Sequence, residues 1–184
     1  EETGSDQWDP RNFGDSYEGP LRMREALARS KNLVSIRILQ AIDVQYAQDY
    51  VTRFGFDPKQ HPAYLAMALG VGSVTPMQMA VGYAAFANGG FLISPYLIQR
   101  IEDVNGNIVE QPKPPLAGED AKQIIDPRNA FLMTSMMRDV VQRGTATKAK
   151  QLGRTDLFGK TGTTNNYVDA WFCGYQPDLV AIAW

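Results

Sequence analysis

Apolar residues recur with helical spacing through the first third of the chain. The spacing predicts one helix over residues 20–30, which opens on a proline as helices often do. It predicts two more over residues 34–42 and 44–54, and Gly55 supplies a C-terminal stop for the third helix. The preceding residues 1–19 are polar and carry Gly, Pro and Asn, so we expect a loop there.

Two later helices are marked by their start signals. Thr75, Pro76 and Gln78 have the form of a capping box with proline at the first helical position, opening a helix over residues 77–87. An Asn-Gly-Gly sequence ends that helix. An Asp-Pro pair opens another helix, which runs over residues 126–144.

The strand signals lie in the second half of the chain. Residues 96–104 and 107–110 flank an Asn-Gly pair, which predicts a hairpin with a tight, two-residue primed turn. Residues 156–184 predict three antiparallel strands in a meander, turning at residues 165–166 and 176–178. The fold class is therefore α+β, an antiparallel sheet with flanking helices, in one domain or most of one.

Composition narrows the functional classes. The chain has 184 residues with 44% apolar and 21% charged residues, the balance of an ordinary globular domain. A net charge of −2 and scattered Lys and Arg give no basic stripe, which argues against nucleic acid. One cysteine and one histidine build neither a disulfide framework nor a common zinc site, so we expect no cofactor and no metal. The sequence also lacks an apolar run of about 18 residues that would span a membrane.

Candidate chemistry begins with Lys160, in the middle of an otherwise uncharged predicted strand. Such a lysine either reaches solvent or meets a partner in a cleft. Thr161 and Thr163 offer hydroxyl donors to a carboxylate, and Gly162 lets a substrate backbone approach closely. This set suits a strand edge that binds an extended peptide. The alternative is a plain edge strand whose solvated lysine blocks aggregation.

A second candidate lies at the end of the first predicted helix. Ser30 and Asn32 are two residues apart, and both can face a cleft if the chain leaves helical geometry there. Ser30 can then relay a proton, and the amide of Asn32 can donate to a carbonyl and accept from an N–H. The alternative is that Ser-Lys-Asn simply caps or turns the chain.

Several segments together resemble a known family. Gly-Lys-Thr-Gly-Thr-Thr-Asn at residues 159–165, followed by Asp-Ala-Trp-Phe at residues 169–172, is a specific combination. The chain resembles class A, bifunctional penicillin-binding proteins, and the Ser-Lys-Asn spelling resembles their Gram-negative members most. The remaining segments that carry the resemblance, in the family's order, are residues 17–32, 68–70, 74–80, 83–90 and 143–146.

The resemblance implies a serine-type D,D-transpeptidase with the penicillin-binding and serine β-lactamase-like fold. Such an enzyme cross-links peptidoglycan stem peptides that end in D-Ala-D-Ala, and β-lactams trap its nucleophilic serine. By position, Ser30 and Lys160 would shuttle the proton to the leaving amine, and Asn32 would hold the substrate amide. Thr161 and Thr163 would bind the terminal carboxylate, beside Gly162. The backbone N–H of Thr163 would form half of the oxyanion hole.

One departure from the family pattern decides whether this chain could catalyse acyl transfer alone. The family's nucleophile lies in a Ser-x-x-Lys motif, and no serine of this chain has lysine three positions on. We therefore expect the nucleophile upstream of Glu1, and the resemblance implies a glycosyltransferase domain and a membrane anchor upstream as well. Residues 1–184 would then be the C-terminal portion of a transpeptidase domain, unable to catalyse acyl transfer alone. The fragment itself would be soluble, and the parent would act on the periplasmic side of the bacterial inner membrane, as a homodimer or with cell-wall synthesis partners.

Two alternatives stay open from the residues. A non-catalytic module of the same fold would sense β-lactams or act as a scaffold. It would need a lost nucleophile in the parent protein, and a scaffold would need neither Lys160 nor Asn32. A D,D-carboxypeptidase or β-lactamase would use the same motifs with a different acyl acceptor. The helix sequences, which resemble class A members, favour the transpeptidase.

Overall fold

A three-stranded antiparallel sheet carries Lys160, Thr161, Gly162 and Thr163 on its first strand. The structure is a computed structural model that describes residues 2–3, 6–15, 17–164 and 167–184. The sheet order is β7-β8-β9, so β7 is an edge strand within the described residues. The predicted meander is confirmed, although its turn at residues 165–166 lies outside the described residues. The three strands are β7 (Phe158–Thr163), β8 (Ala170–Gln176) and β9 (Leu179–Ala183).

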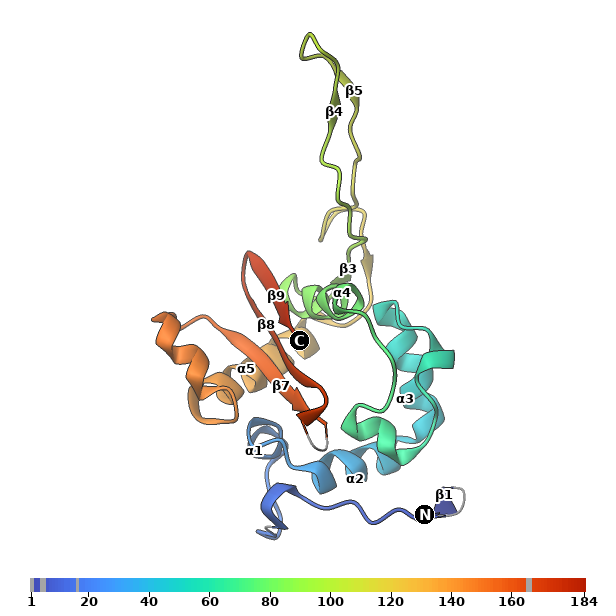
Figure 1. Ribbon diagram of the computed structural model, residues 1–184, viewed down its shortest axis with the longest axis vertical. Helices are drawn as coiled ribbons and strands as arrows, with labels where there is room; N and C mark the ends of the chain where they lie inside the picture. The colour runs from blue at the N-terminus through green and yellow to red at the C-terminus, as the bar shows by residue number, and fades with distance from the viewer. Residues whose placement is uncertain (1, 4–5, 16, 165–166) are drawn as a thin grey trace.

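Helices cover this sheet and build a separate helical layer (Figure 1). Helices α4 and α5 pack on the sheet, and α1 packs against α5. Val140, Val141 and Ala146 form a buried cluster at the end of α5, against which Phe172 of β8 packs. The α-helices are α1 (Met23–Ala28), α2 (Asn32–Ile42), α3 (Val44–Val51), α4 (Pro76–Ala87) and α5 (Pro127–Arg143). The 3-10 turns are η1 (Phe13–Asp15), η2 (Thr52–Phe54), η3 (Pro58–Gln60), η4 (Leu65–Leu69) and η5 (Thr147–Leu152).

The predicted start signals of the later helices are confirmed. The hydroxyl of Thr75 accepts from the N–H of Gln78 at 3.2 Å, and the Gln78 side chain accepts from the N–H of Thr75 at 2.8 Å. Asp126 caps α5 by accepting from the N–H of Arg128 at 2.9 Å. Gly55 ends the third helical segment in the left-handed conformation that favours glycine.

The first two helices differ in their bounds from the prediction. Helix α1 begins at Met23 instead of residue 20, because Arg22 is extended (φ −65°, ψ 141°) and no side chain caps the helix earlier. It ends at Ala28, and Ser30 turns the chain with a positive φ of 52°. Helix α2 then starts at Asn32, two residues before the predicted start. The predicted loop over residues 1–19 contains η1 and the short pair β1 (Glu2–Thr3) and β2 (Asp6–Gln7).

The predicted primed turn is wrong. Strands β4 (Ile101–Glu102) and β5 (Ile108–Glu110) are much shorter than expected and flank a wider loop. A two-residue type I′ turn needs positive φ at both central residues, and only Gly106 has it. Asp103 decides the geometry, because its carboxylate accepts from the backbone N–H groups of residues 105 and 107 at 2.8 and 2.9 Å.

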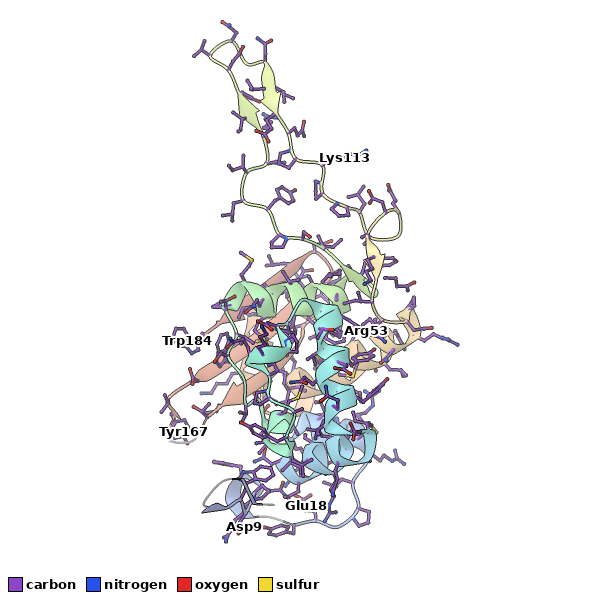
Figure 2. All side chains as sticks on the ribbon, turned by 90° about the vertical axis from the view of Figure 1, so that its right-hand side faces the viewer. Asp9, Glu18, Arg53, Lys113, Tyr167 and Trp184 are labelled. Atoms are coloured by element: carbon purple, nitrogen blue, oxygen red, sulfur yellow. The ribbon has the colours of Figure 1, made fainter. Side chains whose placement is uncertain are left out.

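This hairpin projects away from the rest of the molecule (Figure 1). Its base is the short pair β3 (Phe91–Leu92) and β6 (Lys122–Gln123), and Figure 2 shows Lys113 on the segment that returns toward β6. Among the residues described, no helix has both the length and the apolar character that crossing a membrane requires.

Candidate active site

Ser30 and Lys160 meet although they are 130 positions apart in the sequence. The Lys160 ammonium donates to the Ser30 hydroxyl at 2.7 Å and to the carbonyl of Thr161 at 2.8 Å. Burial disfavours the charged form of the amine and lowers the pKa of Lys160 to about 8. The amine is therefore mostly protonated at neutral pH and half protonated near pH 8, and it contacts a hydroxyl that can pass a proton on.

The backbone geometry of Ser30 comes from the end of α1. The N–H of Lys31 bonds to the carbonyl of Ala26 at 2.9 Å, and the N–H of Ser30 bonds to that of Leu27 at 3.1 Å. This pair of bonds is the Schellman motif, in which glycine usually takes the left-handed position. Ser30 takes that position here with φ 52°, at a cost of about 1–2 kcal/mol for a residue with a Cβ. Strained residues of this kind cluster at functional sites.

The end of α5 joins α1 to β7. A Cβ on Gly144 would collide with the backbone carbonyl of Ala28, so only glycine fits this approach. The next residue, Thr145, donates its N–H to the same carbonyl at 3.1 Å. Its hydroxyl lies 2.6 Å from the hydroxyl of Thr161. Sequence reasoning assigned no role to Thr145, although a glycine at the end of a predicted helix, followed directly by a hydroxyl residue, was a usable signal.

The two glycines of β7 have different surroundings. A Cβ on Gly159 would lie 2.7 Å from the carbonyl oxygen of Cys173 and 3.0 Å from the Cα of Gly174, so packing requires glycine there. A Cβ on Gly162 would meet only the Cβ of Trp171 within 4 Å, at 3.7 Å. The described residues therefore leave room at Gly162, which is exposed together with Thr163.

Asn32 makes a different contact from the one expected. It is the first residue of α2, and its side-chain amide donates to the carbonyl of Arg11 at 2.8 Å. That bond directs the amide N–H of Asn32 toward the N-terminal segment. Lys160 donates to Ser30. The predicted role of Asn32 as a ligand of the substrate amide stays a prediction.

Cys173 is the register partner of Lys160 on β8, and its environment argues against a role as a nucleophile. It is 3% exposed, as is usual for a cysteine that packs as a small apolar side chain. Burial raises the pKa of its thiol to about 11, which keeps it protonated at neutral pH. No cluster of three or more metal-ligating side chains occurs among the described residues.

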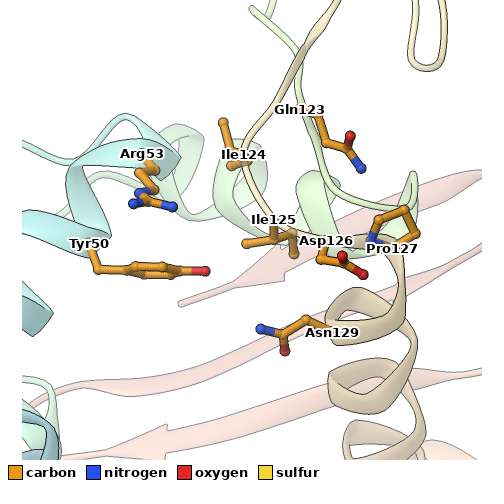
Figure 3. A pocket seen from close by; sticks show the side chains of 8 residues that line it. All are labelled: Tyr50, Arg53, Gln123, Ile124, Ile125, Asp126, Pro127 and Asn129. Atoms are coloured by element: carbon orange, nitrogen blue, oxygen red, sulfur yellow. The ribbon is translucent and has the colours of Figure 1, made fainter.

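A separate cavity of about 410 Å³ lies between η2, β6 and the start of α5 (Figure 3). Its lining contains neither Ser30 nor Lys160, so it is not part of the candidate site. The residues that line it are Tyr50, Arg53, Gln123, Ile124, Ile125, Asp126, Pro127 and Asn129.

Comparison with known proteins agrees with this fold. Residues 2–182 match the penicillin-binding protein transpeptidase domain. The chain is 53% identical over 173 residues to penicillin-binding protein 1A of Neisseria gonorrhoeae, covering 94% of this chain and 22% of that protein. It is 38% identical to the Pseudomonas aeruginosa protein of the same name, covering 96% of this chain and 27% of that one. The crystal structure of penicillin-binding protein 1A from Haemophilus influenzae superposes with a TM-score of 0.93 at 34% identity, covering 99% of this chain and 32% of that chain.

The chain belongs to the penicillin-binding protein transpeptidase domain family. Its relatives are class A proteins of Gram-negative bacteria, which confirms the resemblance stated from the motifs, and the α+β fold class is confirmed as well. The chain spans only about a quarter of the length of these curated relatives.

Proposed function

We propose that this chain supplies two of the three motifs of a peptidoglycan D,D-transpeptidase site. The observation that carries the proposal is the 2.7 Å bond from Lys160 to Ser30. It joins the lysine of one motif to the serine of the other in a partly buried setting. The whole protein would cross-link stem peptides through a serine acyl-enzyme, and β-lactams would acylate the same serine.

Ser30 and Lys160 would deliver the proton that the leaving nitrogen needs during acyl transfer. When the nucleophile attacks the carbonyl carbon, the C–N bond to the terminal D-Ala breaks and its nitrogen needs a proton. Ser30 would pass its hydroxyl proton to that nitrogen and take one from the Lys160 ammonium. A lysine with a pKa of about 8 is well matched to this exchange near neutral pH.

The exposed edge of β7 would bind the substrate peptide. The hydroxyls of Thr161 and Thr163 would donate to the terminal carboxylate, and the N–H of Thr163 would polarise the scissile carbonyl. The room at Gly162 supports this arrangement, because its own neighbours do not require glycine there. A peptide lying along the edge would explain the missing side chain.

The nucleophilic serine would come from a segment upstream of this chain. A glycosyltransferase domain and a membrane anchor upstream would place the site on the periplasmic side of the inner membrane. This chain spans only about a quarter of its relatives' length, which supports a larger parent protein.

The first test is acylation of the full-length protein by a fluorescent penicillin, followed by peptide mapping. We expect label on a serine upstream of Glu1 and a large loss of labelling in Lys160→Ala. If the folded protein takes no label, the proposed enzymatic activity is wrong, and a scaffold role for the same fold is favoured. Transfer of the acyl group to water instead of an amine would identify a carboxypeptidase or β-lactamase.

A further inference from the structure

The residues on either side of Ser30 share one carboxylate. Glu18, in the segment before α1, accepts from both terminal nitrogens of Arg29 in a bidentate pair. The ammonium of Lys31 lies 2.8 Å from the same carboxylate. Figure 2 shows Glu18 at the end of the molecule where the N-terminal segment passes α1 and α2. Glu18 is thus ion-paired with both sequence neighbours of the strained Ser30.

The shared carboxylate lies in a partly sheltered environment. The Glu18 side chain is 32% exposed, and the Lys31 side chain is only 9% exposed. Hydrogen bonds from Arg29, and then from Lys31, hold the pKa of Glu18 below its usual range. Glu18 is therefore ionised at neutral pH, and bidentate arginine pairs fix geometry as well as charge.

The left-handed turn needs such a restraint. Glycine adopts this backbone without strain, whereas serine tends to leave it for more favourable conformations. Any relaxation of φ at Ser30 rotates its side chain and moves the hydroxyl away from Lys160. Holding residues 29 and 31 through one anion restrains the backbone on both sides of residue 30.

We propose that Glu18 is a positioning residue, which holds Ser30 in the left-handed conformation that presents its hydroxyl to Lys160. The inference rests on the proposed function of Ser30 as the proton relay. Glu18 touches neither substrate nor reacting atoms and acts through Ser30 alone.

The test is Glu18→Gln in the full-length protein, with acylation by a chromogenic β-lactam followed in stopped flow. Glutamine keeps the size of the side chain and removes the charge that both cations share. We expect the first-order acylation constant to fall about tenfold or more, with the dissociation constant of the initial complex unchanged. The fraction of protein that takes label at the end point stays at the wild-type level, because the Arg29–Glu18 pair is partly exposed and such pairs add little to global stability.

Glu102→Gln is the matched control. Glu102 also pairs with an arginine, Arg100 at 2.5 Å, and its side chain is 39% exposed, but it lies on the projecting hairpin. We expect wild-type acylation from this variant. Equal acylation constants for Glu18→Gln and Glu102→Gln would overturn the inference. Lys31→Gln removes one of the two attachments and gives a smaller loss, which provides a second variant if Glu18→Gln folds poorly.

A double variant separates this inference from the proposed function. In the Ser30→Ala background no hydroxyl remains to be positioned, so Glu18→Gln should have no further effect on acylation. A full additional loss in that background would show that Glu18 acts elsewhere and would overturn the inference. If Ser30→Ala by itself leaves acylation unchanged, the relay role of Ser30 fails and the inference fails with it. If Ser30→Ala slows acylation and Glu18→Gln does not, only the positioning role is wrong.

Discussion

The backbone carbonyl of Ala28 accepts a hydrogen bond from the N–H of Thr145 at 3.1 Å, across the junction of α1 and α5. The same carbonyl faces Gly144, where a Cβ does not fit. Because Thr145 also bonds through its hydroxyl to Thr161, one contact sets the distance between the Ser30 turn and strand β7. The stability of this junction and the geometry of the site are therefore linked.

Gly144→Ala tests that link. The added methyl would push against backbone atoms of α1, and overpacking of this kind costs about 1–3 kcal/mol. We expect a lower free energy of unfolding in denaturant titrations of the full-length protein, together with slower acylation. Wild-type stability for Gly144→Ala would show that the junction adapts without strain.

Gly162→Ala makes the opposite prediction. Its new Cβ finds ordinary contact distance inside the chain, so the melting temperature should stay within about 2 °C of wild type. Acylation should nevertheless fall, because the methyl would stand where the substrate backbone lies. Measuring both quantities on the same preparation separates the two glycines, and unchanged acylation would argue against a peptide along this edge.

Thr145→Val removes the hydroxyl that contacts Thr161 while keeping its shape. We expect about tenfold weaker binding of a carboxylate-bearing β-lactam, because the orientation of a donor to a charged group is lost. Thr134→Val is the matched control, since its hydroxyl makes a 2.7 Å bond to Tyr175, which is not among the candidate site residues. Binding is measured by competition with a fluorescent penicillin, and equal affinities for the two variants would contradict the role of Thr145.

The acylation rate should report the titration of Lys160. If the ammonium supplies the proton for the leaving nitrogen, the rate falls as pH rises through about 8. Lys160→Arg stays protonated throughout and should lose this limb, with a lower rate at every pH. A wild-type profile that is flat between pH 7 and pH 9, about one unit either side of that pKa, would rule out this proton source.

Stability should depend on the same group with a defined sign. The pKa of Lys160 is about 8 in the folded chain against an ordinary value of 10.5, so between these values the unfolded state binds more protons. The contribution of Lys160 to stability therefore rises with pH across this window and is constant and unfavourable below it. Lys160→Met should remove that slope, which parallel denaturant titrations at pH values spanning this window will reveal.

Local signals in the sequence predicted the starts of two helices, α4 and α5, correctly. The capping box at Thr75 and the cap at Asp126 involve residues two or three apart, so the physics that selects them is complete within one helical turn. The hairpin turn failed for a related reason. The Asn-Gly pair favours a primed turn, but the carboxylate of Asp103 offered competing hydrogen bonds that the dipeptide rule does not weigh.

The sequence by itself determined the chemistry that is available: a serine, a lysine, hydroxyls beside a glycine, and the family to which their spelling belongs. Only the tertiary structure decided how these groups meet. Two contacts join segments that are far apart in sequence: the hydrogen bond between Lys160 and Ser30, and the close approach of Gly144 to Ala28. A third contact, the ion pairs of Glu18 with Arg29 and Lys31, depends on an irregular segment of backbone. Periodicity and caps encode backbone hydrogen bonds between near neighbours, whereas these contacts depend on how whole helices pack against the sheet.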